Sequence, residues 1–220
     1  MHTYYRSPAT VALTFDDGPD PIWTPLVLDA LASVGARATF FVVAPRAARY
    51  APLIFSMRER GHDVAFHCVE HVRHDAMTRR EIEADVESGL LALGRSVHYW
   101  RTPWGLITPA TEEVAIKHRL RLVGWTADTE DWRGGAPEEM LARIRGRISP
   151  GAIVLMHDGV GPGAMRDGCA ATVDLVRPLV ALVRSHGLEP ATLGELRYPL
   201  PDRNPDFRAG ETGTEIVRDV

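Results

Sequence analysis

The sequence predicts an α/β domain whose parallel sheet curls into a closed or nearly closed barrel. Short apolar runs rich in β-branched residues alternate about seven times with amphipathic stretches long enough for helices. Parallel strands need such crossovers, because a hairpin cannot join them. Unusual polar groups follow several of the strand-like runs. A barrel gathers its site from many strand ends, whereas an open doubly wound sheet concentrates its site at one crevice, so these groups favour the barrel.

The strand-like runs are short and apolar, and most are followed by a turn or a helix-forming stretch. They cover residues 10–15, 38–43, 63–66, 98–100, 120–126, 152–156 and 188–192. The last run is the weakest, because Pro190 cannot donate a hydrogen bond to a neighbouring strand.

Helices are expected between these runs, over residues 23–34, 47–60, 79–93, 109–118, 137–148 and 170–185. Glycines mark where several of them should end, since glycine readily adopts the left-handed conformation of a helix C-terminus. These glycines are Gly35, Gly61, Gly94 and Gly187. Pro109 and Pro137 fit the first turn of a helix, where no backbone donor is needed.

Composition limits the classes of function. The chain has 220 residues, of which 45% are hydrophobic and 25% charged, as in an ordinary single globular domain. Its 25 Lys and Arg against 29 Asp and Glu give a net charge of −4, so we expect no nucleic-acid partner. No apolar run approaches the roughly 18 residues of a membrane span, and the N-terminus lacks the features of a leader, so we expect no membrane partner and a cytoplasmic location.

The first chemically informative segment is TFDDGP, residues 14–19. Two adjacent carboxylates at the end of an apolar strand are costly to bring together unless a cation is near. Asp16 and Asp17 would face opposite sides of a regular strand, but the turn imposed by Gly18 and Pro19 breaks that alternation. A solvated turn explains the segment equally well when it is considered alone.

The second segment is HCVEH, which begins at His67 and ends at His71. Histidines four apart lie on one face of a helical turn and can share a metal ion. With Asp17 they make a set of two histidines and one carboxylate, which suits Zn²⁺ or another divalent metal used for hydrolysis. The same set also suits a non-haem iron oxygenase, which the alternation of strands and helices makes the weaker alternative.

Three later segments add polar or aromatic groups at further strand ends. They are RTPWG with Arg101 and Trp104, DTEDW with Asp128, Asp131 and Trp132, and LMHD with Leu155 and His157. Each has an ordinary structural explanation on its own, as a surface ion pair, a core aromatic or a loop residue. Their joint placement at strand ends indicates one site.

Together these five segments resemble the motifs of the polysaccharide deacetylase family, which is carbohydrate esterase family 4 or the NodB homology domain. The match runs in order from about Val11 to Leu196 and departs from the second motif at Cys68, where the family has Ser or Thr. The resemblance implies a single distorted (β/α)7 barrel, which we place at residues 1–198, with a polar C-terminal tail at 199–220. It also implies metal-dependent removal of N-acetyl groups from saccharides that contain N-acetylglucosamine, namely chitooligosaccharides, peptidoglycan-type glycans or small glycoconjugates.

The resemblance assigns a ligand set for one divalent metal ion: Asp17, His67 and His71. Zinc is the first choice, with cobalt, nickel and manganese as alternatives. The remaining roles concern protons and substrate. Asp16 would be the general base, supported by Arg101, and His157 would be the general acid, oriented by Asp131 in preference to Asp128. Trp104, Trp132 and Leu155 would line the pocket for the substrate's acetyl group.

Some features stay open at this level. Cys68 is either a soft fourth ligand or a small buried side chain, and a disulfide with Cys169 is disfavoured in a cytosolic chain. His74 is expected in a loop. Hydrolysis of another acyl bond (an O-acetyl ester or a formamide) and a catalytically silent carbohydrate-binding module are the alternatives to N-deacetylation.

Overall fold

The strands form one parallel sheet that curls on itself. The computed structural model describes residues 9–94 and 96–196, so the predicted tail at 199–220 lies outside the described residues. The strand order is β5-β4-β3-β2-β1-β7-β6, and β8 pairs with the first half of β1. The strands are β1 (Thr10–Asp16), β2 (Thr39–Val43), β3 (Asp63–Cys68), β4 (Tyr99–Trp100), β5 (Arg121–Leu122), β6 (Ala127–Asp128), β7 (Ile153–His157) and β8 (Glu189–Ala191).

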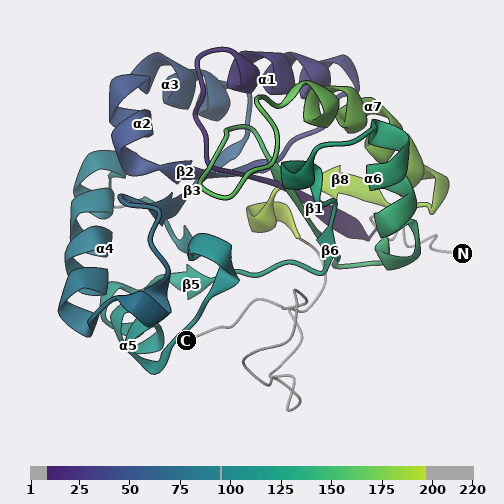
Figure 1. The fold of residues 1–220 in the computed structure, drawn as a ribbon. Helices are drawn as coiled ribbons and strands as arrows, with labels where there is room; N and C mark the ends of the chain where they lie inside the picture. The colour runs from purple at the N-terminus through teal and green to yellow at the C-terminus, as the bar shows by residue number, and fades with distance from the viewer. Residues whose placement is uncertain (1–8, 95, 197–220) are drawn as a thin grey trace, which may run out of the picture.

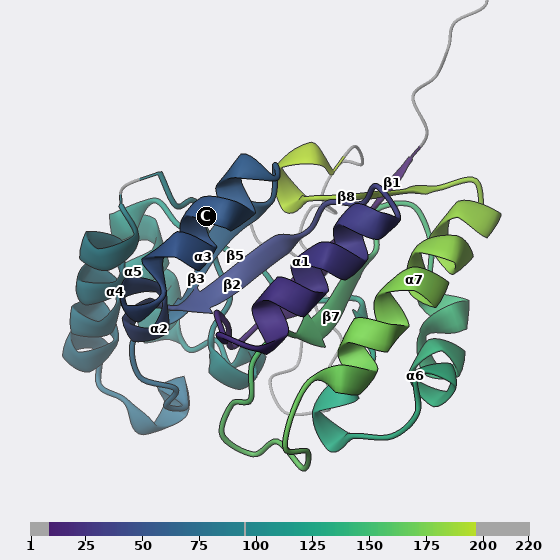
Figure 2. The ribbon, with the colours of Figure 1, turned by 90° about the horizontal axis from the view of Figure 1, so that it is seen from above.

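Helices cover the outer face of this sheet (Figure 1). They are α1 (Trp23–Ser33), α2 (Ala44–Arg49), α3 (Ala51–Glu59), α4 (Arg79–Leu93), α5 (Pro109–His118), α6 (Pro137–Ile144) and α7 (Ala170–Ser185). Figure 2 shows α1 and α7 side by side over the sheet, and the two helices are in contact. The curled sheet with its outer helices is the distorted (β/α)7 barrel that the sequence predicts.

Two predicted elements are wrong in detail. The helix expected over residues 47–60 is two helices, α2 and α3, which meet at Tyr50. Pro52 explains the break, because proline lacks the N–H that a helix interior needs and its ring clashes with the preceding turn. The strand expected over residues 120–126 is confined to β5, and β6 begins only after it, at Ala127. β5 and β6 are the two ends of the described strand order and do not pair with each other, so the barrel is open between them.

Side-chain alternation along the strands separates the core into two parts. On β1, Val11, Leu13 and Phe15 belong to the large core between the sheet and the helices. Ala12 belongs instead to a small cluster inside the curl of the sheet, together with Phe41 of β2. A strand points successive side chains to opposite faces, so every second residue of β1 faces the interior of the barrel.

The same alternation carries polar residues to the interior at the carboxyl ends of the strands. Asp16 lies four residues after Ala12 and therefore faces inward. On β3, His67 follows the inward-facing Ala65 by two residues. On β7, His157 is the residue paired in register with Asp16. The fold thus brings groups from three separate strands to one rim.

Within residues 9–94 and 96–196, no helix combines the length and apolar character needed to cross a membrane. Cys68 and Cys169 are both buried and unbonded to each other, so the disulfide that the sequence analysis disfavoured is absent.

Candidate active site

A cavity of about 220 Å³ opens at the carboxyl ends of the strands. Eight of the ten residues that the sequence analysis selected line it, and Arg101 and Asp131 lie behind the lining residues that they contact. The lining residues are Asp16, Asp17, His67, His71, Thr102, Trp104, Gly105, Trp125, Asp128, Trp132, Leu155, His157, Gly161, Pro162, Gly163 and Ala164.

Asp16 is buried and paired with a buried arginine. Arg101 Nη1 donates to Asp16 Oδ1 and to Thr14 Oγ1, both at 2.8 Å. The rest of the Arg101 guanidinium donates to the carbonyls of Val123 and Gly124, and it packs over the ring of Phe41. Burial lowers the pKa of Arg101, but an arginine stays charged at any ordinary pH. The pair therefore holds the Asp16 carboxylate in one orientation beside a fixed positive charge.

Asp17 turns into the same cavity because its backbone leaves the strand conformation. Its φ of 72° lies in the left-handed region, which residues other than glycine seldom adopt. This turn lets two successive carboxylates line one cavity, as the sequence analysis expected. Gly161 packs so closely that a Cβ there would lie 2.2 Å from Asp17 Oδ2, so only glycine fits at that position.

His67 and His71 point their Nε2 atoms at Asp17. The distances from Asp17 Oδ1 are 3.4 Å to His67 Nε2 and 3.3 Å to His71 Nε2. His67 Nδ1 lies 2.7 Å from the carbonyl oxygen of Arg101, to which it donates, and this bond leaves Nε2 free to face the carboxylate. One potential ligand atom from each residue falls in a group whose members all lie within 4.8 Å of one another.

This cluster fits a divalent metal ion. Asp17 Oδ1 is buried and makes no hydrogen bond to any described residue, and a buried carboxylate oxygen without a partner is costly. Burial raises the pKa of Asp17, but the nearby His67 and His71 outweigh burial and hold that pKa well below its usual range, so the carboxylate is ionised. Two imidazole nitrogens and one carboxylate oxygen are the ligands of many catalytic zinc sites.

His157 is held from behind by a fully buried carboxylate. Its Nδ1 lies 2.7 Å from Asp131 Oδ1, and its backbone N–H donates to Asp131 Oδ2 at 3.0 Å. Burial lowers the pKa of His157, but the charge and hydrogen bond of Asp131 outweigh burial and raise it to about 9. Asp128 instead accepts from the backbone N–H of Glu130, so Asp131 is the carboxylate that orients His157.

Aromatic and aliphatic side chains form the walls of the cavity. Trp104 is 43% exposed and packs edge-on against the His71 ring, with ring centroids 4.3 Å apart. Trp132 and Leu155 line the cavity beside His157, as does Trp125, which the sequence analysis did not select. These walls can hold a small apolar group next to the polar cluster.

Two charged residues that were not predicted from the sequence stabilise the loops of the site. Asp85 on α4 accepts from the backbone N–H groups of Val69 and Glu70, between the two histidines. Arg166 contacts Asp131 Oδ2 at 3.3 Å and donates to the carbonyl of His157 at 3.2 Å. They lie outside the five motifs, and no local pattern distinguishes them from surface charges.

Two further expectations concern residues near the second motif. His74 was expected in a loop, and it begins a one-turn 3₁₀ helix (His74–Ala76) between β3 and α4, where it is buried and its Nδ1 lies 2.9 Å from Thr111 Oγ1. Cys68 is buried, and its sulfur is not part of the potential ligand group. Burial raises the pKa of the Cys68 thiol, which favours the small buried side chain over a thiolate ligand.

Fold and site together define a class of protein: a hydrolase built on a distorted (β/α)7 barrel, with its polar cluster at the carboxyl ends of the strands. Residues 4–123 match the family model for polysaccharide deacetylase. The chain therefore belongs to the polysaccharide deacetylase family, carbohydrate esterase family 4, and it is a deacetylase. This membership also sets aside the iron oxygenase.

Known deacetylases are similar to this protein over most of the chain, which supports this assignment. The chain is 34% identical over 170 residues to a chitooligosaccharide deacetylase of Sinorhizobium fredii, which covers 75% of this chain and 79% of the relative. It is 30% identical over 194 residues to a peptidoglycan-N-acetylglucosamine deacetylase of Bacillus cereus, covering 86% and 88%. Among solved structures, the Bc1960 peptidoglycan N-acetylglucosamine deacetylase superposes with a TM-score of 0.78 at 26% identity, covering 86% of this chain and 88% of that one.

Proposed function

We propose that the protein is a metal-dependent N-deacetylase of saccharides that contain N-acetylglucosamine. One observation carries this proposal: a cluster fit for a divalent metal lines the same cavity as the carboxylate of Asp16 and the imidazole of His157, whose pKa is raised. Amide hydrolysis requires an activated water, a stabilised oxyanion and a protonated leaving group. The cavity contains a candidate for each requirement.

Asp17, His67 and His71 would hold the metal, with zinc as the first choice. A bound divalent metal would supply Lewis acidity, both toward the substrate carbonyl and toward water. The histidine Nε2 atoms already face the carboxylate, and the His67 ring is fixed from its other nitrogen. Little rearrangement of these residues is needed to bind an ion.

Asp16 serves as the general base in this proposal. It faces the cavity beside the ligand cluster, and its hydrogen bond with Arg101 fixes the carboxylate that would accept a proton from the attacking water. Arg101 acts through Asp16 and is therefore a positioning residue.

His157 serves as the general acid. Because its pKa is raised to about 9, the imidazole carries a proton at neutral pH that it can donate to the departing amine nitrogen. Asp131 bonds Nδ1, so the proton on Nε2 is the one available to a substrate. Trp132 and Leu155 line the cavity next to this proton and provide apolar surface for the methyl of an acetyl group.

The experiment that tests the proposal is metal reconstitution. The purified chain is stripped of metal with a chelator, single divalent ions are added back, and acetate release is measured from N-acetylglucosamine oligomers of graded length. We expect no release from the stripped protein and restored release with zinc, cobalt, nickel or manganese. Full activity without metal would overturn the metal dependence, and release from O-acetyl esters or formamides alone would overturn N-deacetylation.

A further inference from the structure

The loop of residues 158–169 joins β7 to α7 and forms part of the wall of the active-site cavity (Figure 1). Four of its residues line the cavity: Gly161, Pro162, Gly163 and Ala164. Arg166 follows them, and its side chain is only 7% exposed. A buried charge is costly unless its donors find acceptors, so the partners of this side chain show what it does. Arg166 lies outside the five motifs, and the proposed function gives it no role.

The Arg166 guanidinium contacts the carboxylate that lies behind His157. Its Nη1 is 3.3 Å from Asp131 Oδ2 and also donates to the hydroxyl of Thr172. The Thr172 hydroxyl in turn donates to Asp131 Oδ2 at 2.6 Å. Asp131 Oδ1 is the oxygen that bonds Nδ1 of His157. The guanidinium and the hydroxyl therefore hold one oxygen of the carboxylate, so that the other oxygen stays aimed at the imidazole.

The other end of the same guanidinium fastens the loop to the strand. Arg166 Nη2 donates to the carbonyl of His157 at 3.2 Å and to the carbonyl of Gly159 at 3.4 Å. The neighbouring Met165 donates its backbone N–H to the carbonyl of Trp132 at 2.8 Å, and Trp132 directly follows Asp131 in the chain. One side chain therefore connects the backbone of His157, the carboxylate that orients its ring and the loop that lines the cavity.

The charge of Arg166 matters because Asp131 is fully buried. Burial raises the pKa of Asp131, but the nearby His157, Arg166 and Thr172 outweigh burial and lower it. A guanidinium keeps its charge at any pH at which a hydrolase works, whereas an imidazolium loses its charge when it donates a proton. Among the residues that the structure describes, Arg166 is then the cation that remains at ion-pair distance from Asp131. Without it, proton donation would leave a buried carboxylate with no ionic partner, which is costly.

We propose that Arg166 is a positioning residue of the general acid, which serves as the lasting counter-charge of Asp131 while the proton leaves His157 and ties the cavity loop to both. The inference rests on the proposed N-deacetylase function, because an amine leaving group needs a proton as it departs. Arg166 lowers the cost of giving up that proton. Its loss should therefore matter most for substrates whose leaving group must be protonated.

The test compares two acetyl compounds with different leaving groups. The tetramer of N-acetylglucosamine releases an amine, which must gain a proton, whereas 4-nitrophenyl acetate releases a phenolate that departs without one. The zinc-dependent kcat/KM is measured on both. We expect Arg166→Gln to lower kcat/KM on the tetramer by about tenfold, the effect of losing one charge-assisted contact, and on the ester by no more than about twofold. Arg166→Lys should regain part of the loss, because it keeps the charge but not the forked geometry.

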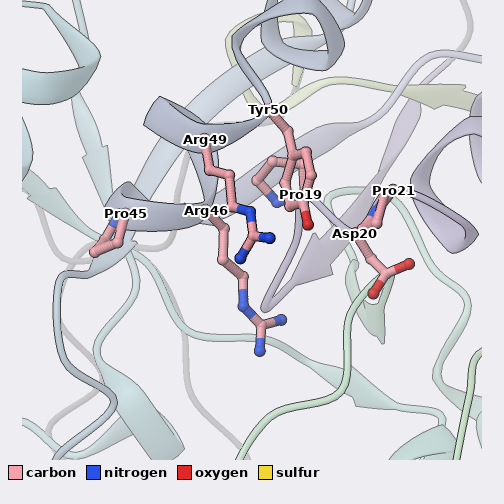
Figure 3. A pocket seen from close by; sticks show the side chains of 7 residues that line it. All are labelled: Pro19, Asp20, Pro21, Pro45, Arg46, Arg49 and Tyr50. Atoms are coloured by element: carbon pink, nitrogen blue, oxygen red, sulfur yellow. The ribbon is translucent and has the colours of Figure 1, made fainter.

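Arg46→Gln and Arg177→Gln are the matched controls. Figure 3 shows Arg46 extending from α2, and its Nη2 donates to the carbonyl of Val160 in the same loop at 3.0 Å. Its loss loosens the loop without removing a charge from Asp131, so kcat/KM should fall equally on both substrates. Arg177 lies on α7 and donates to the exposed Ser33 hydroxyl, so its loss should change neither value. An equal fall on both substrates in Arg166→Gln would show a merely structural role and overturn the proposal.

Titration of His157, followed by NMR in the zinc-loaded protein, separates this inference from the function on which it rests. The charged groups that act on His157 come from several elements: Asp16, Asp17, Asp128, Asp131 and Arg166. Loss of the guanidinium leaves the carboxylates in place, so Arg166→Gln should raise the pKa of His157 by about one unit. An unchanged or lowered pKa would overturn the proposal. If the pKa rises while the wild type releases no acetate, the deacetylase function fails and the role of Arg166 beside Asp131 stands.

Discussion

Asp16 and Asp17 are neighbours in the chain, yet the fold gives their carboxylates different partners. Asp16 Oδ1 accepts a hydrogen bond from a buried guanidinium, whereas Asp17 Oδ1 faces two imidazoles without a hydrogen bond to a described residue. The left-handed backbone at Asp17 produces this division, because it turns the second carboxylate into the cavity that the first one already faces. Two identical side chains can therefore take two roles, one toward a metal and one toward a proton.

Asp16→Asn tests the role of the general base. We expect turnover to fall by about 10²- to 10⁴-fold, since an amide cannot accept the proton while the rest of the cavity stays in place. The amide oxygen can still accept from Arg101, so the metal content of the variant, measured by elemental analysis, should match that of the wild type. A variant with normal turnover would contradict the assignment of Asp16 as base.

Asp131→Asn tests how the general acid keeps its proton. The pKa of His157 is raised to about 9 by Asp131, so activity that needs the protonated imidazole falls as the pH rises through that value. Removing the negative charge lets the pKa fall toward about 6.5, the ordinary value for histidine, so the loss of activity should begin at lower pH. The pH dependence of kcat/KM provides the measurement, with Asp128→Asn as the matched control. If kcat/KM of Asp131→Asn fell at the same alkaline pH as that of the wild type, the result would contradict the pairing of Asp131 with His157.

At the scale of elements, the strands were predictable because they are short apolar runs rich in β-branched residues. Such runs located β1, β2, β3 and β7, whereas the face that each side chain takes became clear only in the fold, where Ala12 and hence Asp16 point inward. Pro52 is a sequence signal for the break between α2 and α3. The amphipathic pattern on either side of Pro52 nevertheless predicts one continuous helix. The early end of β5 within residues 120–126 had no comparable signal, since a continuous apolar run does not show where pairing with a neighbouring strand ends.

The hydrogen bonds that fix the loops of the site could not be predicted from the sequence. Cys68 stands where the family has a hydroxyl residue, and a thiol is a weaker hydrogen-bond partner than a hydroxyl. In the fold, Asp85 of α4 accepts from the N–H groups of Val69 and Glu70 and fastens this loop. The two partners are about fifteen residues apart and belong to separate elements, so only tertiary structure reveals the bond.

Arg46→Gln tests whether a contact between elements controls the ligand cluster. Arg46 on α2 connects the carbonyl of Asp17 to the carbonyl of Val160, which belongs to the loop after β7. Loss of groups that orient ligands typically costs 10- to 100-fold in metal affinity, and we expect a fall of about tenfold in affinity for zinc, measured by competition with a chromophoric chelator. Arg49→Gln is the control, because Arg49 lies on the same helix without these bonds. Equal affinities for the two variants would contradict this role of Arg46.

At the scale of the whole molecule, the site depends on the order of the strands. Asp17 follows β1 while His67 lies on β3, and β2 pairs with both of these strands between them. His157 comes from β7, on the other side of β1. An ion bound by Asp17, His67 and His71 would therefore tie together segments that meet only in the folded chain. The barrel itself is open between β5 and β6, so such a link would add a constraint that the sheet does not provide.

Metal binding should consequently stabilise the whole fold. A ligand that binds only the native state at about a thousand times its dissociation constant adds about 4 kcal/mol to the free energy of unfolding. For a domain of this size each kcal/mol raises Tm by about 2–4 °C, so saturating zinc should raise Tm by roughly 8–16 °C in scanning calorimetry. His71→Ala removes one ligand and should lose most of this gain, whereas His186→Ala, on an exposed histidine after α7, should keep it. A Tm that does not respond to metal or chelator in the wild type would contradict the ligand cluster itself.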